Sequence, residues 1–144
     1  MVDSTAEDVA IRCVIDAWTQ ALHDKDVKAE AACVAADLVV YSLAPPLVSP
    51  QDGGNDLQAW FDTWSGPIGY VLSDLVLATA GDVAFAHGLA HMTGTKTDGE
   101  TPDLWFRVTL GLRRNQGAWK IVHVHESVPF LMDGSFKAAL DLKP

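Results

Sequence analysis

The chain contains 144 residues and carries a net charge of -9, because 19 acidic residues stand against 10 basic ones. A charge of this sign repels nucleic-acid phosphates and anionic lipid surfaces, so neither a nucleic acid nor a membrane is expected as a partner. Hydrophobic residues make up 49% of the chain and charged residues 20%, as in ordinary globular domains. No apolar run approaches the ~18 residues of a membrane span.

The chain is predicted to form a single domain, residues 1–144, that resides in the cytoplasm. Its length suits one hydrophobic core, and no linker or internal repeat interrupts the sequence. The first residues, from Met1 to Ser4, lack the basic and apolar segments of a secretion signal.

Three helices are predicted in the first half of the chain. The first covers residues 5–23, where a capping-box spacing is followed by apolar residues at every third or fourth position. Asp26 is a suitable N-cap for a second helix that reaches Val34. A loop rich in proline and glycine separates this part from the third helix, residues 55–65.

The second half of the chain follows the alternation of β-strands. From Ile68 onward the hydrophobic period changes to two, and glycine-containing turn signals divide the sequence into strands. A first strand is predicted earlier, at residues 38–43. Four strands then follow in succession, at residues 68–79, 83–93, 103–114 and 118–129. Helices first and strands afterwards indicate the α+β class.

The order of these elements resembles that of a known superfamily. Together with the segments 105–109 and 119–129, it resembles the nuclear transport factor two-like superfamily, and within it the SnoaL-like homologues of ketosteroid isomerase. This resemblance implies a cone-like fold, in which three N-terminal helices pack on a strongly curved, mainly antiparallel sheet and enclose a pocket. The last two strands are also similar to the association domain of calmodulin-dependent kinase type II.

Two positions depart from the steroid isomerases. The resemblance places Leu43 where those enzymes carry a catalytic aspartate, and Trp18 where they carry an oxyanion-binding tyrosine. The superfamily includes isomerases, dehydratases, cyclases and assembly modules, so the resemblance is specific for the fold and not for the chemistry.

The register of the last two strands decides which side chains face the pocket. A turn at residues 115–118 places Arg114 opposite Trp119, and a regular ladder then places Arg107 opposite Glu126. Because side chains alternate across a strand, Arg107 and Glu126 would share one face, and His125 would take the other. A shift of one residue would exchange the two sets.

The predicted catalytic residues are Glu126, Arg107 and His87. Glu126 would act as a general base, and Arg107 or His87 would stabilise the oxyanion that forms. A buried ion pair between Arg107 and Glu126 without catalytic duty is the structural alternative. The predicted ligand-binding residues are Tyr41, Trp64, Trp105, Thr109 and His125.

No metal ion and no organic cofactor are expected. His87 and His91 lie roughly 13 Å apart along a strand, so they cannot chelate one ion. His123 and His125 are closer but lack a third ligand, and no glycine-rich phosphate loop follows a strand.

Two functions are predicted. The first is binding of a small hydrophobic carbonyl compound, with isomerase, cyclase or dehydratase activity by proton transfer without a cofactor. The alternative is a non-catalytic ligand-binding or assembly module. We expect a homodimer through the outer sheet face, where Val108, Leu110 and Leu112 would otherwise contact water.

Overall fold

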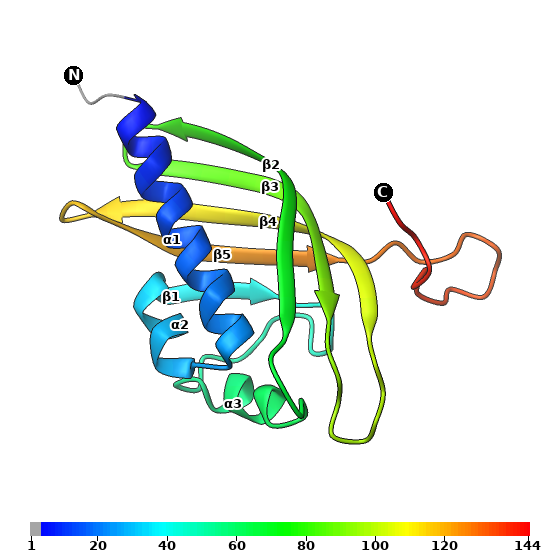
Figure 1. Cartoon of the computed structure of the whole chain (residues 1–144). Helices are drawn as coiled ribbons and strands as arrows, with labels where there is room; N and C mark the ends of the chain where they lie inside the picture. Colours follow the sequence, from blue (N-terminus) through cyan, green and yellow to red (C-terminus); the bar gives the residue numbers. More distant parts are fainter. Residues whose placement is uncertain (1–3) are drawn as a thin grey trace.

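Three helices pack on one face of a curved five-stranded sheet in the computed structural model, which describes residues 4–144 (Figure 1). This arrangement confirms the predicted cone-like α+β class. Residues 1–3, on which the expected lack of a secretion signal largely depends, lie outside the described part. The elements are α1 (Ser4–Asp24), α2 (Val27–Cys33), β1 (Val34–Tyr41), α3 (Asn55–Phe61), β2 (Gly69–Ala80), β3 (Val83–Thr93), β4 (Asp103–Asn115) and β5 (Ala118–Ser127).

Helix α1 buries the apolar stripe that its sequence predicted. Ile11, Ile15 and Trp18 are almost completely buried and belong to the core cluster with the inner side chains of β4 and β5. Glu7 reaches the β4–β5 hairpin, where Arg114 and the Trp119 indole donate hydrogen bonds of 2.5 and 2.6 Å to its two carboxylate oxygens. These bonds fix the start of the helix to the far end of the sheet.

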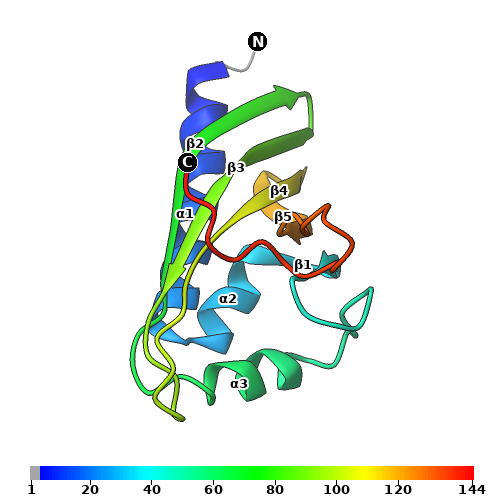
Figure 2. The same ribbon diagram turned by 90° about the vertical axis from the view of Figure 1, so that its right-hand side faces the viewer.

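The sheet is mixed and open, with the strand order β1-β5-β4-β3-β2. The strands from β2 to β5 form the predicted antiparallel meander, while β1 pairs with β5 in parallel. Figure 2 shows α2 and α3 closing the lower end of the molecule below β1 and the loop after β1 projecting on one side. Strand β1 begins at Val34, four residues before the predicted start at residue 38, directly after α2.

An irregularity between Ser73 and Val76 bends β2 and gives the sheet much of its curvature. Asp74 adopts a left-handed backbone conformation there, with φ of 55°. On the neighbouring strand, a Cβ at Gly88 would lie 2.8 Å from the Ser73 carbonyl oxygen. A glycine at position 88 therefore lets β3 approach the bent part of β2.

A second irregularity changes the predicted register of β4 and β5. Arg114 lies opposite Trp119 and Leu112 opposite Ile121, as the predicted turn requires. The next pair, however, is Gly111 with His123, so that Val122 is an extra residue on β5. Beyond this bulge, Glu126 and Val124 still face the interior as predicted, but they share that face with Val108 and Leu110 of β4 and not with Arg107 and Thr109.

Helix α3 ends at Phe61, four residues earlier than predicted. The Trp60 and Phe61 carbonyls accept backbone hydrogen bonds from Thr63 and Trp64, which closes the helix in a tight turn. Trp64 then forms an isolated β-bridge with Lys96. Within residues 4–144, no helix is long and apolar enough to cross a membrane.

Candidate functional site

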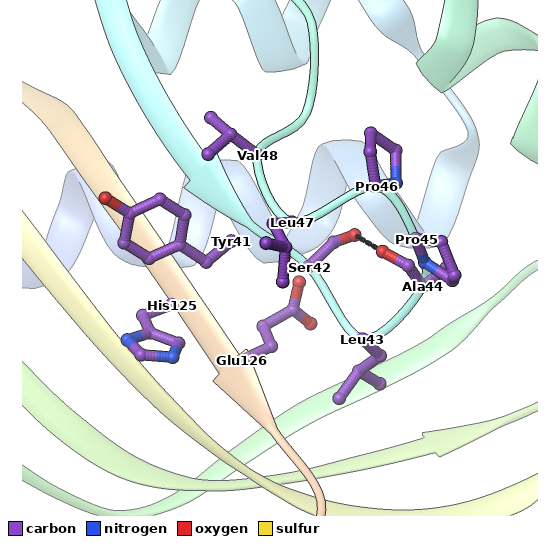
Figure 3. Close-up of a pocket in the computed structure, with 10 residues that line it drawn as sticks. All are labelled: Tyr41, Ser42, Leu43, Ala44, Pro45, Pro46, Leu47, Val48, His125 and Glu126. Atoms are coloured by element: carbon purple, nitrogen blue, oxygen red, sulfur yellow. Dashed lines mark hydrogen bonds between the residues drawn. The ribbon is translucent and has the colours of Figure 1, made fainter.

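A cavity of about 620 Å³ opens between the ends of β1 and β5 and the loop that follows β1 (Figure 3). The loop is held at its base by a backbone hydrogen bond of 3.0 Å from Ser49 to Val40. Near its start, the Ser42 hydroxyl donates a 3.0 Å hydrogen bond to the Ala44 carbonyl. The cavity is lined by Tyr41, Ser42, Leu43, Ala44, Pro45, Pro46, Leu47, Val48, His125 and Glu126.

Glu126 is the single carboxyl group in this lining, and it comes from the inner face of the sheet. Its partner across the ladder is Val108, which is 1% exposed. The Tyr70 hydroxyl, from the far strand β2, crosses the interior of the cone and donates a 3.1 Å hydrogen bond to Glu126 Oε2. Figure 3 shows the carboxylate directed into the space between β5 and the loop.

Tyr70 is held in place by aromatic packing. Its ring meets Trp18 of α1 and Phe106 of β4 edge to face, with ring centroids 5.4 and 5.6 Å away. All three rings are buried. This packing leaves the Tyr70 hydroxyl few positions other than the one beside Glu126.

Burial raises the pKa of Glu126 to about 7, although the hydrogen bond from Tyr70 acts in the opposite direction. The pKa of Tyr70 also rises well above its ordinary value, because of its own burial and then because of the Glu126 charge and hydrogen bond. Tyr70 therefore stays protonated and acts as a donor, while Glu126 exchanges its proton close to neutral pH.

Trp18 has a structural role. The resemblance implied an oxyanion-binding tyrosine at this position. Trp18 contacts the Tyr70 ring, and its indole hydrogen-bonds the carboxylate of Glu30 in α2. Burial raises the pKa of Glu30, and the bond from Trp18 opposes this rise. Trp18 thus joins the helices to the aromatic group that supports Glu126.

Tyr41 and His125 border the cavity on the other side of Glu126. They are partners across the parallel pairing of β1 and β5, and their rings meet edge to face at 5.3 Å. Tyr41 also contacts His123, whose Nδ1 donates a 2.8 Å hydrogen bond to the Val39 carbonyl. Two of the five predicted ligand-binding residues, Tyr41 and His125, therefore line the cavity.

The predicted pairing of Arg107 with Glu126 is wrong. Arg107 lies opposite Ser127, and its Nε donates a 3.1 Å hydrogen bond to the Ser127 hydroxyl on the exposed side of the sheet. Thr109 is opposite His87 on one side and His125 on the other, so Thr109 and His87 share this outer face. The bulge at Val122 is the reason that Arg107 and Glu126 are not paired and lie on opposite faces.

The two predicted tryptophan walls also lie elsewhere. Trp105 stacks on the His91 ring at 4.3 Å, in the outer-face row that Arg107 belongs to. Trp64 is 2% exposed and packs in the core against Trp60, away from the cavity lining. The apolar residues predicted to form an outer dimer patch are instead fully inside: Val108, Leu110 and Leu112.

Tyr70 is the residue that the sequence-based reasoning missed. It lies 56 positions from Glu126, on the far strand of the sheet, so no local spacing connects the two residues. The bulge did leave a signal, because Gly111 interrupts the strand pattern and an isolated glycine in a strand often marks a bulge. Among residues 4–144, no three His, Cys, Asp or Glu side chains are grouped so that they could hold a metal ion.

Comparisons with known proteins agree with this fold. An NTF2-like protein of unknown function from Pseudomonas putida is 34% identical, with a TM-score of 0.86 over 98% of this chain and 99% of the other. The association domain of C. elegans CaMKII shares the fold at 19% identity, with a TM-score of 0.66 over 85% of this chain and 96% of the other. A Mycobacterium tuberculosis protein of unknown function is similar at 16% identity, with a TM-score of 0.75 over 94% of this chain and 84% of the other.

No curated protein gave a significant match to the sequence. The SnoaL-like domain profile, in contrast, matches residues 11–131. This span includes Tyr70, Glu126 and the whole loop that closes the cavity. The chain therefore belongs to the SnoaL-like domain family.

Proposed function

We propose that this protein binds a small apolar carbonyl compound in the cavity beside Glu126 and catalyses proton transfer on it without a cofactor. The observation that carries the proposal is a mostly buried carboxyl group that faces a cavity and has a pKa of about 7. A general base is most effective when its pKa lies close to the working pH. Isomerases, cyclases and dehydratases all use such a step.

The step balances with Glu126 alone as the proton carrier. Its carboxylate takes a proton from the carbon next to the carbonyl group, and the electron pair of the C–H bond moves to the carbonyl oxygen as an enolate forms. The neutral carboxyl group then returns the proton to carbon. Tyr70 is a positioning residue in this scheme, since its hydrogen bond fixes the orientation of the carboxylate.

The developing oxyanion needs a donor other than the ones predicted from the sequence. Arg107 and His87 lie on the opposite face of the sheet. The cavity lining offers the hydroxyl of Tyr41 and the imidazole of His125, whereas the Ser42 hydroxyl already donates to the Ala44 carbonyl. Of these, Tyr41 and His125 already contact each other, so one can orient the other toward a ligand.

Hydrogen–deuterium exchange of β-tetralone, a small apolar ketone with acidic C–H bonds, tests this function. We expect the protein to accelerate exchange at the carbon next to the carbonyl group, as measured by NMR. Glu126→Gln should abolish the acceleration while ketone affinity stays within about tenfold. Thr109→Ala, on the outer face, is the matched control and should exchange as the wild type does. Equal rates for Glu126→Gln and the wild type would refute the assignment of the base.

The alternative function, as an assembly module, is favoured by the outer sheet face. Large apolar side chains there are exposed by 37% to 62%, and paired positions place them on one side of the sheet. A second copy of the chain is the simplest cover for such a surface. The residues are Val39, Tyr41, Val71, Val76 and Phe85.

Light scattering tests the homodimer. We expect a dimeric mass for the wild type at micromolar concentration and a monomeric mass for Phe85→Asp, because the new carboxylate would have to be buried at the interface. Val9→Asp replaces an exposed residue of α1 and is the control that should stay dimeric. A monomeric wild type would remove the homodimer from this proposal.

A further inference from the structure

We propose that the cavity rejects anionic ligands and admits an uncharged apolar substrate. The natural substrate is then a carbonyl compound without a carboxylate, a phosphate or a nucleotide-bearing carrier at the part that is bound. This inference rests on the proposed function and narrows its substrate class. It comes from the charges of the cavity lining and from the places where the cationic side chains of the chain are used.

The lining holds one acidic group and no lysine or arginine. Its ten residues include the Glu126 carboxyl group, while its other polar side chains are those of Tyr41, Ser42 and His125. The remaining residues are apolar and come from the loop after β1. An anionic ligand would therefore meet a carboxylate of the same charge and no fixed cation to offset it.

Three of the four arginines are committed elsewhere. Arg107 bonds Ser127 on the outer face, and Arg113 pairs with Asp37 at 3.0 Å. Arg114 pairs with Glu7 and Asp82 at the other end of the sheet.

Three of the six lysines are also used away from the cavity. Lys25 donates a hydrogen bond to the Trp64 carbonyl, and Lys96 lies over the Trp64 ring at 4.1 Å. Lys120 hydrogen-bonds the Ala32 carbonyl. None of these side chains lines the cavity, so the lining itself holds no lysine or arginine for a bound anion.

Tyr70 does not change the charge of the cavity lining. Its hydroxyl gives Glu126 one hydrogen bond at Oε2 but no positive charge. The second oxygen, Oε1, has no hydrogen-bond partner among those found within residues 4–144, and Figure 3 shows the carboxylate directed toward the loop. A ligand carbonyl can accept a proton from neutral Glu126 and a C–H bond can give one to its ionised form, but a ligand carboxylate can only repel the ionised form.

The remaining lining sets the apolar part of the preference. Leu43, Leu47 and Val48 supply aliphatic surface, and two adjacent prolines at positions 45 and 46 complete the wall. Leu47 is 93% exposed, so a bound molecule would cover apolar surface that otherwise contacts water. A neutral ring compound fits both the surface and the charge.

The titratable groups that bond Glu126 or line the cavity with it are Tyr70 from β2, Tyr41 from β1 and His125 on its own strand. From the helices, the titratable group Glu30 is connected to this cluster through Trp18, which contacts Tyr70 and hydrogen-bonds Glu30. His125 is the second side chain of the lining that can carry a charge, as a cation when both ring nitrogens are protonated. Protonation of either group would favour an anion, so a test must separate the two.

Three probes of one size and shape make the test: acetonaphthone, naphthoate and naphthylmethylamine, with binding measured by calorimetry. At about pH 8 we expect the ketone and the amine to bind at least about tenfold more tightly than naphthoate, because a like charge is close by. At about pH 5.5, naphthoate affinity should rise about tenfold toward that of the ketone, whose own affinity should stay constant. Glu126→Gln should remove this rise, and His125→Gln, the matched control, should keep it.

The results separate this inference from the proposed function. Naphthoate binding as tightly as the ketone at about pH 8 would overturn the charge preference and leave proton transfer on a carbonyl compound intact. A rise that persists in Glu126→Gln and disappears in His125→Gln would also overturn it, because His125 would then set the preference. Failure of all three probes to bind would instead count against the proposed ligand site itself.

Discussion

The two faces of β5 differ in almost every property, although they are formed by neighbouring residues. Glu126 points inward, is mostly buried and has a pKa of about 7. Ser127, the next residue, points outward and bonds the exposed Arg107. The difference arises from the single extra residue Val122. One inserted residue decides whether a carboxyl group becomes a candidate base in a cavity or one half of a surface ion pair.

The same contrast extends across the whole sheet. The inner face carries apolar and aromatic side chains with few polar groups, so the charge of Glu126 is weakly screened there. The outer face carries His87, Thr109 and His125 in one row across three strands, together with the exposed aromatic ring of Phe85. Water reaches this face, and ion pairs on it contribute little to stability. Chemistry that depends on a shifted pKa belongs to the inner face.

Deleting Val122 should give the largest effect, because it would restore a regular ladder and reverse residues 123–127. Val124 and Glu126 would turn outward, and two histidines would be buried in their place. We expect a loss of roughly 5 kcal/mol in the free energy of unfolding, or no cooperative unfolding at all, in urea titrations followed by circular dichroism. Deleting the exposed Met132, beyond the strand, is the control and should be nearly neutral. A small effect of the Val122 deletion would mean that no bulge separates the two faces.

Substitutions at neighbouring positions of β4 should show the same difference in stability between the inner and outer faces, with no change of register. Leu110 is completely buried, and Leu110→Ala should cost about 4 kcal/mol through lost burial and a residual cavity. Thr109→Ala, one residue away on the outer face, should change the free energy of unfolding by less than about 0.5 kcal/mol. Guanidinium titrations of the two variants give both numbers, and similar losses would contradict the assignment of faces.

Glu126→Gln should change the pH dependence of stability. The folded-state pKa of Glu126, about 7, lies above the ordinary value of 4.5, so the native protein holds the extra proton between these two pH values. The free energy of unfolding of the wild type therefore falls as the pH rises through this window and levels off above it. Glu126→Gln lacks this loss, and relative to wild type it should gain up to about 3 kcal/mol between pH 4.5 and pH 8. Parallel stability profiles for the two proteins would show that the carboxyl group is not perturbed.

Arg107→Met should have only a small effect. A desolvated pair with Glu126 would make this substitution cost about 3 kcal/mol. With Arg107 exposed and bonded to Ser127, we expect less than about 1 kcal/mol in thermal or urea unfolding, and no change in ketone exchange. A loss near the larger value would restore the pairing that the regular ladder predicted.

Much of the fold could be predicted because its signals are local. The stripe of Ile11, Ile15 and Trp18 on α1 and the alternation in the four last strands are periodic patterns within single elements. The turn that pairs Arg114 with Trp119 was also predicted, since residues that favour turns can be recognised in the sequence. The β4 side chains that share a face with Glu126 were predicted wrongly, because the alternation was carried through a bulge whose one signal was Gly111.

The sequence by itself determined the class of fold, the family resemblance and the presence of a polar cluster near the end of β5. Only the tertiary structure decided which of those polar residues share a cavity. Tyr70 reaches Glu126 across the interior because an irregularity bends β2, and Arg107 is kept away because a bulge adds one residue to β5. Both effects depend on how strands pair over long sequence separations. The energy of such pairing depends on tertiary contacts and cannot be predicted from the spacing of residues within one element.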